Sequence, residues 1–231
     1  MRLIPIAIIS GLILGLAPYS IANETPNLSE YRYNIFQWVY PEYYFKAEQV
    51  SIKKEGMKKE AGHAITFFGL SACIPDEYTE PNQISKNSVT YRTSGKKTGL
   101  AISIDDETKL LCSDIAKSRE KDFCSSFNSA KEYYHKLFSL TPDSIDETTS
   151  TGDMLLIHAK GIFFEHIKKI KIYNGKSFTA YAREFDDHST PLKQELIIFH
   201  KRLPEHKYIV VGFSASDINV ETFLKTLSPT I

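Results

Sequence analysis

The sequence predicts an α+β fold in which a mainly antiparallel, twisted sheet carries helices on both faces. The prediction starts from four β-rich runs that follow one another in the second half of the chain: Ile167–Tyr173, Ser177–Phe185, Gln194–His200 and Lys207–Phe213. The connections between these runs are short, which favours antiparallel pairing because parallel strands need long crossovers. Asn174-Gly175 suits a two-residue hairpin turn between the first two runs, since both turn residues would take positive φ.

The last two runs indicate that both faces of the sheet are covered. Apolar and polar residues alternate in the first two runs, which is typical of strands with one dry face and one wetter face. Leu196–Phe199 and Tyr208–Val211 are apolar at every position, and a strand that is apolar on both sides is buried on both sides. We expect helices to form the second cover, so the predicted architecture is an α/β/α sandwich.

Two segments have the apolar spacing of covering helices. Ser126–Leu140 carries one apolar stripe at positions 127, 130, 134, 137 and 138, and a Thr-Pro pair ends it. A last helix has Asp217 or Asn219 as its cap and apolar residues at positions 220, 223, 224 and 227. For Met154–Ile157 a short helix is favoured over a strand.

Further strands are expected before the first of these helices. Ala64–Leu70 is predicted as one strand, with Pro75 ending that region. Val89–Arg92 and Leu100–Ile104 are predicted as a hairpin, because apolar residues alternate in its second arm.

Residues 1–22 have the pattern of a secretory signal peptide. Arg2 precedes the apolar run Leu3–Ala17, and Ser20-Ile21-Ala22 supplies the small residues of a cleavage site. The rival interpretation is an uncleaved membrane anchor, since the run approaches spanning length, but two prolines and the cleavage-like site favour cleavage. Cleavage would leave 231 − 22 = 209 residues, which suits a single α+β domain over residues 23–231. We expect a periplasmic or secreted protein without a stable membrane span.

Three cysteines would remain after cleavage, and export would place them in an oxidising compartment. Cys112 and Cys124 flank a short polar segment, so we predict a disulfide between them, worth about 3 kcal/mol in the chain-entropy treatment. A Cys73–Cys112 pairing stays open, because spacing does not fix connectivity. For Cys73 we favour a buried, small apolar residue over a reactive thiol or an intermolecular link.

The N-terminal segment 23–49 is unusually aromatic between positions 31 and 45. An exposed aromatic surface would bind a partner protein, a glycan or a membrane face, and its candidate partner-binding residues are Tyr31, Trp38, Tyr40 and Tyr44. The alternative is a helix and a strand laid across the sheet. That structural alternative is favoured, because positions 35 and 39 are ordinary core residues, Ile and Val.

Charge and motifs argue against several functional classes. Lys+Arg 28 balance Asp+Glu 28 without a basic run, which gives no electrostatic case for nucleic acid. The sequence has no P-loop, dinucleotide fingerprint or H-E-x-x-H motif. Gly69-Leu70-Ser71-Ala72-Cys73 departs from the G-x-S-x-G elbow of serine hydrolases at its last position. We therefore predict no catalytic residue, no metal and no cofactor.

Three weaker chemical alternatives remain. Asp186-Asp187-His188 comes closest to a metal-ligand cluster, but such residues are common in turns. Glu165 and His166 would form a polar pair, which a hydrated strand entry explains. Cys73 with a distant His is the remaining nucleophile, and this alternative requires an exposed, activated thiol.

Five features follow one another along the chain: the strand Ile65–Leu70, the hairpin Val89–Ile104, the helix Ser126–Leu140, the strand pair around Asn174-Gly175, and Tyr208–Phe213 followed by the helix Phe223–Leu227. In the order of these elements the chain resembles the PsbP-like family, which includes the photosystem II extrinsic protein and Mog-type Ran-binding proteins. The five features cover roughly the last three-quarters of the exported chain. The resemblance implies an α/β/α sandwich and a binding or assembly role, and it transfers no site residue.

These observations together predict an exported, non-enzymatic binding or assembly protein of the cell envelope. Its expected partner is another envelope or secreted protein. A periplasmic immunity protein against a secreted toxin is an alternative, since export, modest size and the missing catalytic motifs fit that role too. A hydrolase with a non-standard site is the alternative from a different class.

Overall fold

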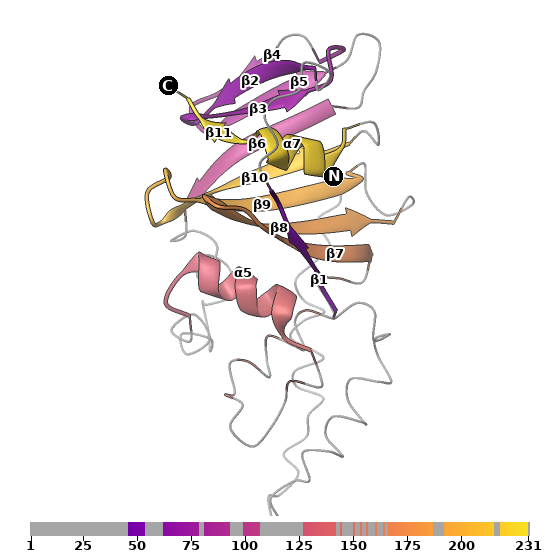
Figure 1. Cartoon of the computed structure of the whole chain (residues 1–231), viewed down its shortest axis with the longest axis vertical. Helices are drawn as coiled ribbons and strands as arrows, with labels where there is room; N and C mark the ends of the chain where they lie inside the picture. The colour runs from indigo at the N-terminus through magenta and orange to yellow at the C-terminus, as the bar shows by residue number, and fades with distance from the viewer. Residues whose placement is uncertain are drawn as a thin grey trace, which may run out of the picture.

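The computed structural model describes residues 46–53, 62–78, 81–92, 99–106, 127–141, 144, 150, 153, 156, 160, 164, 166–186, 192–214 and 218–230 (Figure 1). The predicted signal peptide (residues 1–22), the aromatic positions 31–45 and the predicted Cys112–Cys124 disulfide lie outside the described residues. The elements below therefore belong to the part of the chain that follows the aromatic segment.

The main element of the described structure is one eight-stranded sheet. In spatial order its strands are β1 (Glu48–Ser51), β7 (Ile167–Asn174), β8 (Phe178–Phe185), β9 (Gln194–His200), β10 (Lys207–Phe213), β6 (Gly99–Asp106), β5 (Ser88–Arg92) and β4 (Pro81–Ile84). β1 pairs with β7 in parallel, and every other neighbouring pair is antiparallel. The four predicted runs thus form consecutive antiparallel strands, β7 to β10.

A second, three-stranded antiparallel sheet lies over one face of the main sheet. It has the order β11 (Ser228–Pro229), β3 (Leu70–Ile74) and β2 (His63–Phe67). The helix α7 (Val220–Thr226) is joined to it, because the Thr226 hydroxyl accepts a hydrogen bond from the Cys73 backbone N–H over 2.9 Å. The helix α5 (Ala130–Ser139) lies on the opposite side of the main sheet (Figure 1).

Both faces of β9 and β10 are buried, as their sequence predicts. Ile198 and Ile209 face a core shared with the small sheet and α7. Ile197 and Tyr208 face a second core shared with α5. Neighbouring residues alternate between the two cores because successive side chains of a strand point to opposite faces.

The predicted α/β/α sandwich is wrong. The described structure is mostly β, and α5 and α7 are the two helices whose bounds it defines. The second face of the main sheet is covered chiefly by β2 and β3, where the prediction placed a helical layer. Asp153, Leu156 and Lys160 are helical, in line with the short helix favoured near this position.

The sequence analysis did not predict the layer formed by β2 and β3 because it missed one turn. Ala64–Leu70 was predicted as one strand, but Phe68 and Gly69 take positive φ values of 47° and 77° and fold the run into the β2–β3 hairpin. Two consecutive positive φ values suit a tight hairpin, but the usual sequence signal is Asn-Gly. Phe rarely takes this conformation, so the sequence carries no standard turn signal here.

The predicted Asn174-Gly175 turn is wrong in register. Asn174 is the last residue of β7. Among the described glycines, Gly62 and Gly69 have positive φ values and Gly175 does not. The turn is closed by the Gly175 N–H, which donates to the Phe178 carbonyl over 3.0 Å, and its centre is Lys176-Ser177. Glycine is needed at 175 because a Cβ there would lie 2.4 Å from the Phe178 ring.

Both bounded helices are short and capped by side chains. Ser129 Oγ accepts from the Glu132 N–H at the start of α5, and Asn219 Oδ1 accepts from the Thr222 N–H at the start of α7. Asn219, rather than Asp217, is therefore the cap that the structure shows. Within the described segments, no helix has the length and apolar character needed to cross a membrane.

Phe223 provides a test of the first core. Its ring is fully buried, stacks on Phe67 at 6.0 Å and meets Phe213 edge-on at 5.7 Å between centroids. We expect Phe223→Ala to lower the free energy of unfolding by about 3–5 kcal/mol, because it leaves a cavity between the two sheets. Urea unfolding measures this loss. Ile84→Ala is the matched control, because Ile84 is 73% exposed and its truncation should change stability by less than about 0.5 kcal/mol.

Candidate functional site

The structure describes few of the predicted site residues. The residues outside it are Tyr31, Trp38, Tyr40, Tyr44, Cys112 and Cys124. Lys46 is the first described residue after the aromatic segment, and β1 starts two residues later. The segment that follows the aromatic residues therefore lies at the edge of the main sheet.

β1 holds this part of the chain on the sheet. Glu48 lies opposite Lys171 of β7 and Ser51 lies opposite Asn174. Just after β1, the Ile52 N–H donates to the Asn174 carbonyl over 2.9 Å. Val50 packs against the first core while the other residues of β1 are exposed, so backbone pairing with β7 is the main attachment of this strand.

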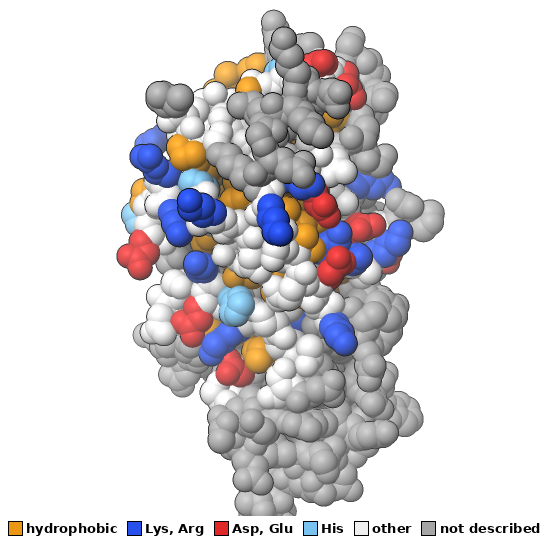
Figure 2. Space-filling model, in the orientation of Figure 1, with side chains coloured by type: hydrophobic (Ala, Val, Ile, Leu, Met, Phe, Trp, Pro, Cys, Tyr) orange, Lys and Arg blue, Asp and Glu red, His pale blue; other side chains and the backbone are white. Residues whose placement is uncertain are grey.

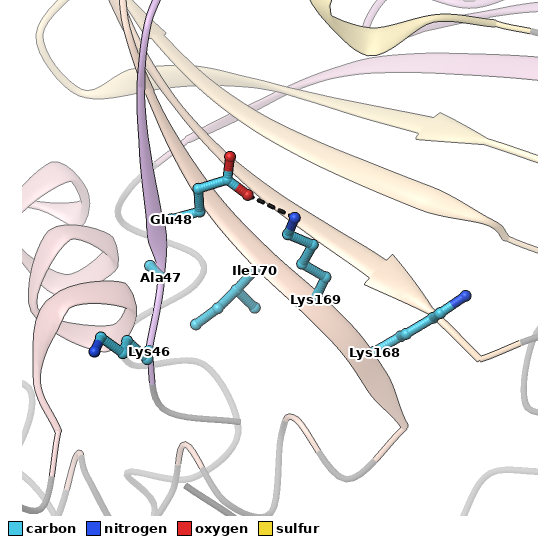
Figure 3. Close-up of a pocket in the computed structure, with 6 residues that line it drawn as sticks. All are labelled: Lys46, Ala47, Glu48, Lys168, Lys169 and Ile170. Carbon is cyan, nitrogen blue, oxygen red and sulfur yellow. Dashed lines mark ion pairs between the residues drawn. The ribbon is translucent and has the colours of Figure 1, made fainter. Parts of the chain in front are cut away.

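A shallow depression of about 400 Å³ lies where β1 and β7 begin (Figure 3). We call it the β1–β7 depression, and its lining residues are Lys46, Ala47, Glu48, Lys168, Lys169 and Ile170. Ala47 and Ile170 belong to the second core, whereas Lys46 and Lys168 are exposed and point away to either side (Figure 3). The depression thus combines a small apolar centre with a charged border.

The charges around this depression are largely balanced. Lys169 Nζ lies 2.6 Å from Glu48 Oε2, and Lys168 Nζ lies 3.8 Å from Glu184 Oε1 (Figure 3 shows the first pair). The hydrogen bond from Lys169, followed by the charge of Lys171, lowers the pKa of the Glu48 carboxyl. Glu48 is consequently ionised at neutral pH and poorly suited to exchange protons with a substrate. The Glu48–Lys169 pair is therefore not arranged for acid–base chemistry near neutral pH.

The most strongly perturbed lysine in the described chain lies elsewhere. Lys160 is fully buried, and its Nζ donates to the carbonyls of Phe138 and Leu140 over 3.2 Å and 2.8 Å. These carbonyls lie at the C-terminus of α5, where the last turn lacks helical partners and a cation is favoured. Burial lowers the pKa of Lys160 to about 7. Its role is to hold the end of α5 against the core.

Aromatic rings enclose another charged group beside α5. Arg183 of β8 pairs with Glu195 of β9, and its guanidinium lies 6.0 Å and 5.6 Å from the ring centroids of Phe164 and Phe185. Burial raises the pKa of Tyr133 to about 12 and raises that of Tyr181 as well. Both tyrosines are therefore neutral near pH 7 and serve as packing residues, Tyr133 on α5 and Tyr181 on β8 beneath it.

Cys73 does not have the exposure that a nucleophile needs. Its residue exposure is 6%, it lies opposite Ala64 in the small sheet, and its backbone N–H donates to Thr226. The alternative of a thiol hydrolase required an exposed Cys73, so burial removes that candidate nucleophile. The favoured interpretation of Cys73 as a buried small residue agrees with this position.

No metal cluster is formed by the residues that the structure describes. Among them, no group of three or more His, Cys, Asp or Glu side chains is placed to hold an ion. Asp186 and His166 are described, and the Asp186 N–H donates to the His166 carbonyl over 3.0 Å. Glu165, Asp187 and His188 lie outside the described residues.

Comparisons with models of known protein families and with curated proteins find no match to this chain.

Sequence reasoning missed both Lys160 and the depression. Lys160 follows Leu156 by four residues, so it lies on the same side of a helix, and this spacing was a usable signal for a buried lysine. β1 is short and polar, with the sequence EQVS, and has no strand signal of its own. Its position is decided by pairing with β7.

Lys160→Met should change how stability depends on pH. The pKa of Lys160 is 10.5 in an unfolded chain and about 7 in the folded protein, so between these values the unfolded state binds more protons. The contribution of Lys160 to the free energy of unfolding is therefore highest above pH 10.5, where Lys160 is neutral in both states. It decreases as the pH falls, and the stabilising effect of deprotonation is lost as the pH falls through about 7. Relative to Lys160→Met, the wild type should gain up to about 1.4 kcal/mol per pH unit across this window.

Urea unfolding of both proteins from about pH 7 to about pH 9 measures this difference, in a range where tyrosines are not yet ionised. Parallel stability curves for the two proteins would contradict the buried position of the Lys160 ammonium group.

Proposed function

We propose that this chain is an exported binding or assembly protein of the cell envelope that docks a partner protein at the β1–β7 depression. The depression itself is the observation that carries the proposal: half-buried Ala47 and the buried Ile170 form its apolar floor, and charged side chains surround them. Protein interfaces combine an apolar centre with a polar rim in the same way. Small-molecule sites are usually deeper clefts that enclose most of the ligand.

The position of the aromatic segment in the chain supports the same surface. Tyr44 precedes Lys46 by two residues, so its Cα lies within about 7 Å of that residue even in an extended chain. Trp38 precedes Lys46 by eight residues, within a reach of about 28 Å. Trp and Tyr are enriched among the residues that dominate interface affinity. The candidate aromatic residues can therefore contribute to the contact that the depression begins.

The balanced charges favour a protein partner that itself presents both signs. Lys46 and Lys168 border the depression, and the Glu48–Lys169 pair lies between β1 and β7. A partner with a small apolar anchor and a flanking carboxylate would meet the apolar centre and the exposed lysines together. Such a partner would be an envelope or secreted protein, given the predicted export signal.

Site-directed photocrosslinking in the cell envelope tests this function. A photoreactive residue is placed at position 46, at position 168 or at position 131, which is exposed on α5 and does not line the depression. We expect one protein to be crosslinked from positions 46 and 168 and not from position 131. We also expect the triple variant Trp38→Ala, Tyr40→Ala, Tyr44→Ala to reduce that product more than tenfold, since hot-spot residues each contribute over about 1 kcal/mol.

The triple variant is interpreted only if its urea-unfolding midpoint equals that of the wild type. Equal crosslinking by a folded triple variant would return the aromatic segment to a structural role. A product of equal yield from all three positions, or none from positions 46 and 168, would rule out docking at the depression.

A further inference from the structure

One end of the main sheet gathers four exposed cations from three segments that are distant in sequence. They are Lys53 after β1, Lys176 in the β7–β8 turn, and Lys201 and Arg202 in the β9–β10 turn. We call this surface the basic end. Figure 2 shows Lys and Arg side chains gathered at the left of the visible face, the side on which Figure 1 places the β9–β10 turn.

Hydrogen bonds hold the three segments next to one another. The Ile52 N–H donates to the Asn174 carbonyl and the Lys201 N–H donates to the Ser177 carbonyl, each over 2.9 Å. Neighbouring strands of a sheet lie about 4.8 Å apart, so the backbones that carry the four cations span about 15 Å. This span is nearly twice the Debye length of about 8 Å at physiological salt, so the outer cations are screened from one another and act together only by each contacting the same charged surface.

These four cations differ from the other lysines of the sheet in their surroundings. Lys168, Lys169 and Lys171 each have a glutamate within 4.0 Å, whereas no described carboxylate lies that close to any cation of the basic end. The acidic groups that the structure describes at this end lie in the β9–β10 turn and on β6. Glu205 is exposed in the β9–β10 turn, and His206 Nε2 lies 4.0 Å from Asp106 of β6, whose neighbour is Asp105. The positive charge is therefore concentrated over β1, β7, β8 and β9.

The β9–β10 turn presents its cations from an ordered backbone. The buried His200 ring accepts the Arg202 N–H at Nδ1 over 3.1 Å, and the Leu203 N–H donates to the His200 carbonyl over 3.0 Å. Burial, followed by the charge of Arg202, lowers the pKa of His200, so the ring is neutral and can accept at neutral pH. Little conformational entropy of the turn backbone is left to lose when Lys201 and Arg202 meet a partner.

We propose that the basic end is a docking surface for the anionic phosphate headgroups of an envelope membrane. Each Lys or Arg near an anionic bilayer contributes about 1 kcal/mol, so several cations that have no described carboxylate within 4.0 Å add up to useful affinity. A single soluble phosphate is a poorer fit, because all four cations are exposed and solvated ion pairs contribute little individually. The formal net charge is zero, so the attraction depends on this local concentration of charge.

This inference goes beyond the proposed partner site at the β1–β7 depression and is independent of it. Docking on lipid uses the end of β1 that carries Lys53, whereas the depression lies where β1 begins. Only the predicted export is shared, because it brings the chain to the envelope. A negative result in the photocrosslinking test of the depression therefore leaves the vesicle-binding test of the basic end valid, and the reverse also holds.

Vesicle co-sedimentation tests the proposal. The full chain, purified after export, is mixed at low salt with vesicles of phosphatidylcholine alone or with phosphatidylglycerol added. We expect binding to the anionic vesicles only, falling steeply as salt is raised. The double variant Lys201→Gln, Arg202→Gln should bind roughly thirtyfold more weakly, because it removes two cations at about 1 kcal/mol each.

The matched control is Lys131→Gln, Arg92→Gln, which removes the same residue types from exposed positions on α5 and at the end of β5. It should bind as the wild type does, whereas neutralising all four cations of the basic end should abolish binding. Equal weakening by the control, equal binding to both kinds of vesicle, or no binding to anionic vesicles at low salt would overturn the proposal. Retention on an immobilised soluble polyanion without vesicle binding would overturn it too, because the lipid surface is its stated partner.

Discussion

The structure depends on covering both faces of two central strands. β9 and β10 place Leu196, Ile198 and Ile209 in one core and Ile197 and Phe199 in the other. Burying each such side chain contributes about 1.5–3 kcal/mol, so a layer missing from either face would expose apolar surface that the fold needs to bury. α5 covers one face, and the small sheet with α7 covers the other. The remaining elements can be understood as attachments to this three-layer centre.

The small sheet is held in place by the C-terminal end of the chain. Thr226 Oγ1 accepts from the Cys73 N–H and donates back to the Phe223 carbonyl, which ties α7 to β3. Beyond α7, β11 pairs with β3, and the Thr230 N–H donates to the Gly69 carbonyl at the β2–β3 turn. The last dozen described residues therefore close a layer whose two long strands come from near the start of the described chain.

Both faces of β9 and β10 are occupied in the described structure, and the two surfaces proposed above lie at an edge and at an end of the main sheet. β1 links the two surfaces that the structure singles out: it begins at the β1–β7 depression and ends beside Lys53. The charged groups in the interior have different roles. Lys160 binds the end of α5, and the Arg183–Glu195 pair is enclosed by aromatic rings, so both contribute to packing rather than to chemistry. The interior charges described here thus serve packing, while the two proposed binding surfaces lie at the periphery of the main sheet.

The sequence by itself determined the strands β7 to β10, the helix over Ala130–Ser139, the helix after Asn219 and the burial of both faces of β9 and β10. Apolar periodicity carries this information because it records which side of each element is dry. It did not determine what covers the second face, since an apolar face is satisfied equally by a helix or by another sheet.

Only the tertiary structure decided that cover, through positive φ values at Phe68 and Gly69 that no standard turn signal announces. It also decided the depression and the basic end. Each combines residues in or next to β1 with residues from later strands or turns. Pairing between these distant segments brings them together, and periodicity along the chain carries no information on such pairing.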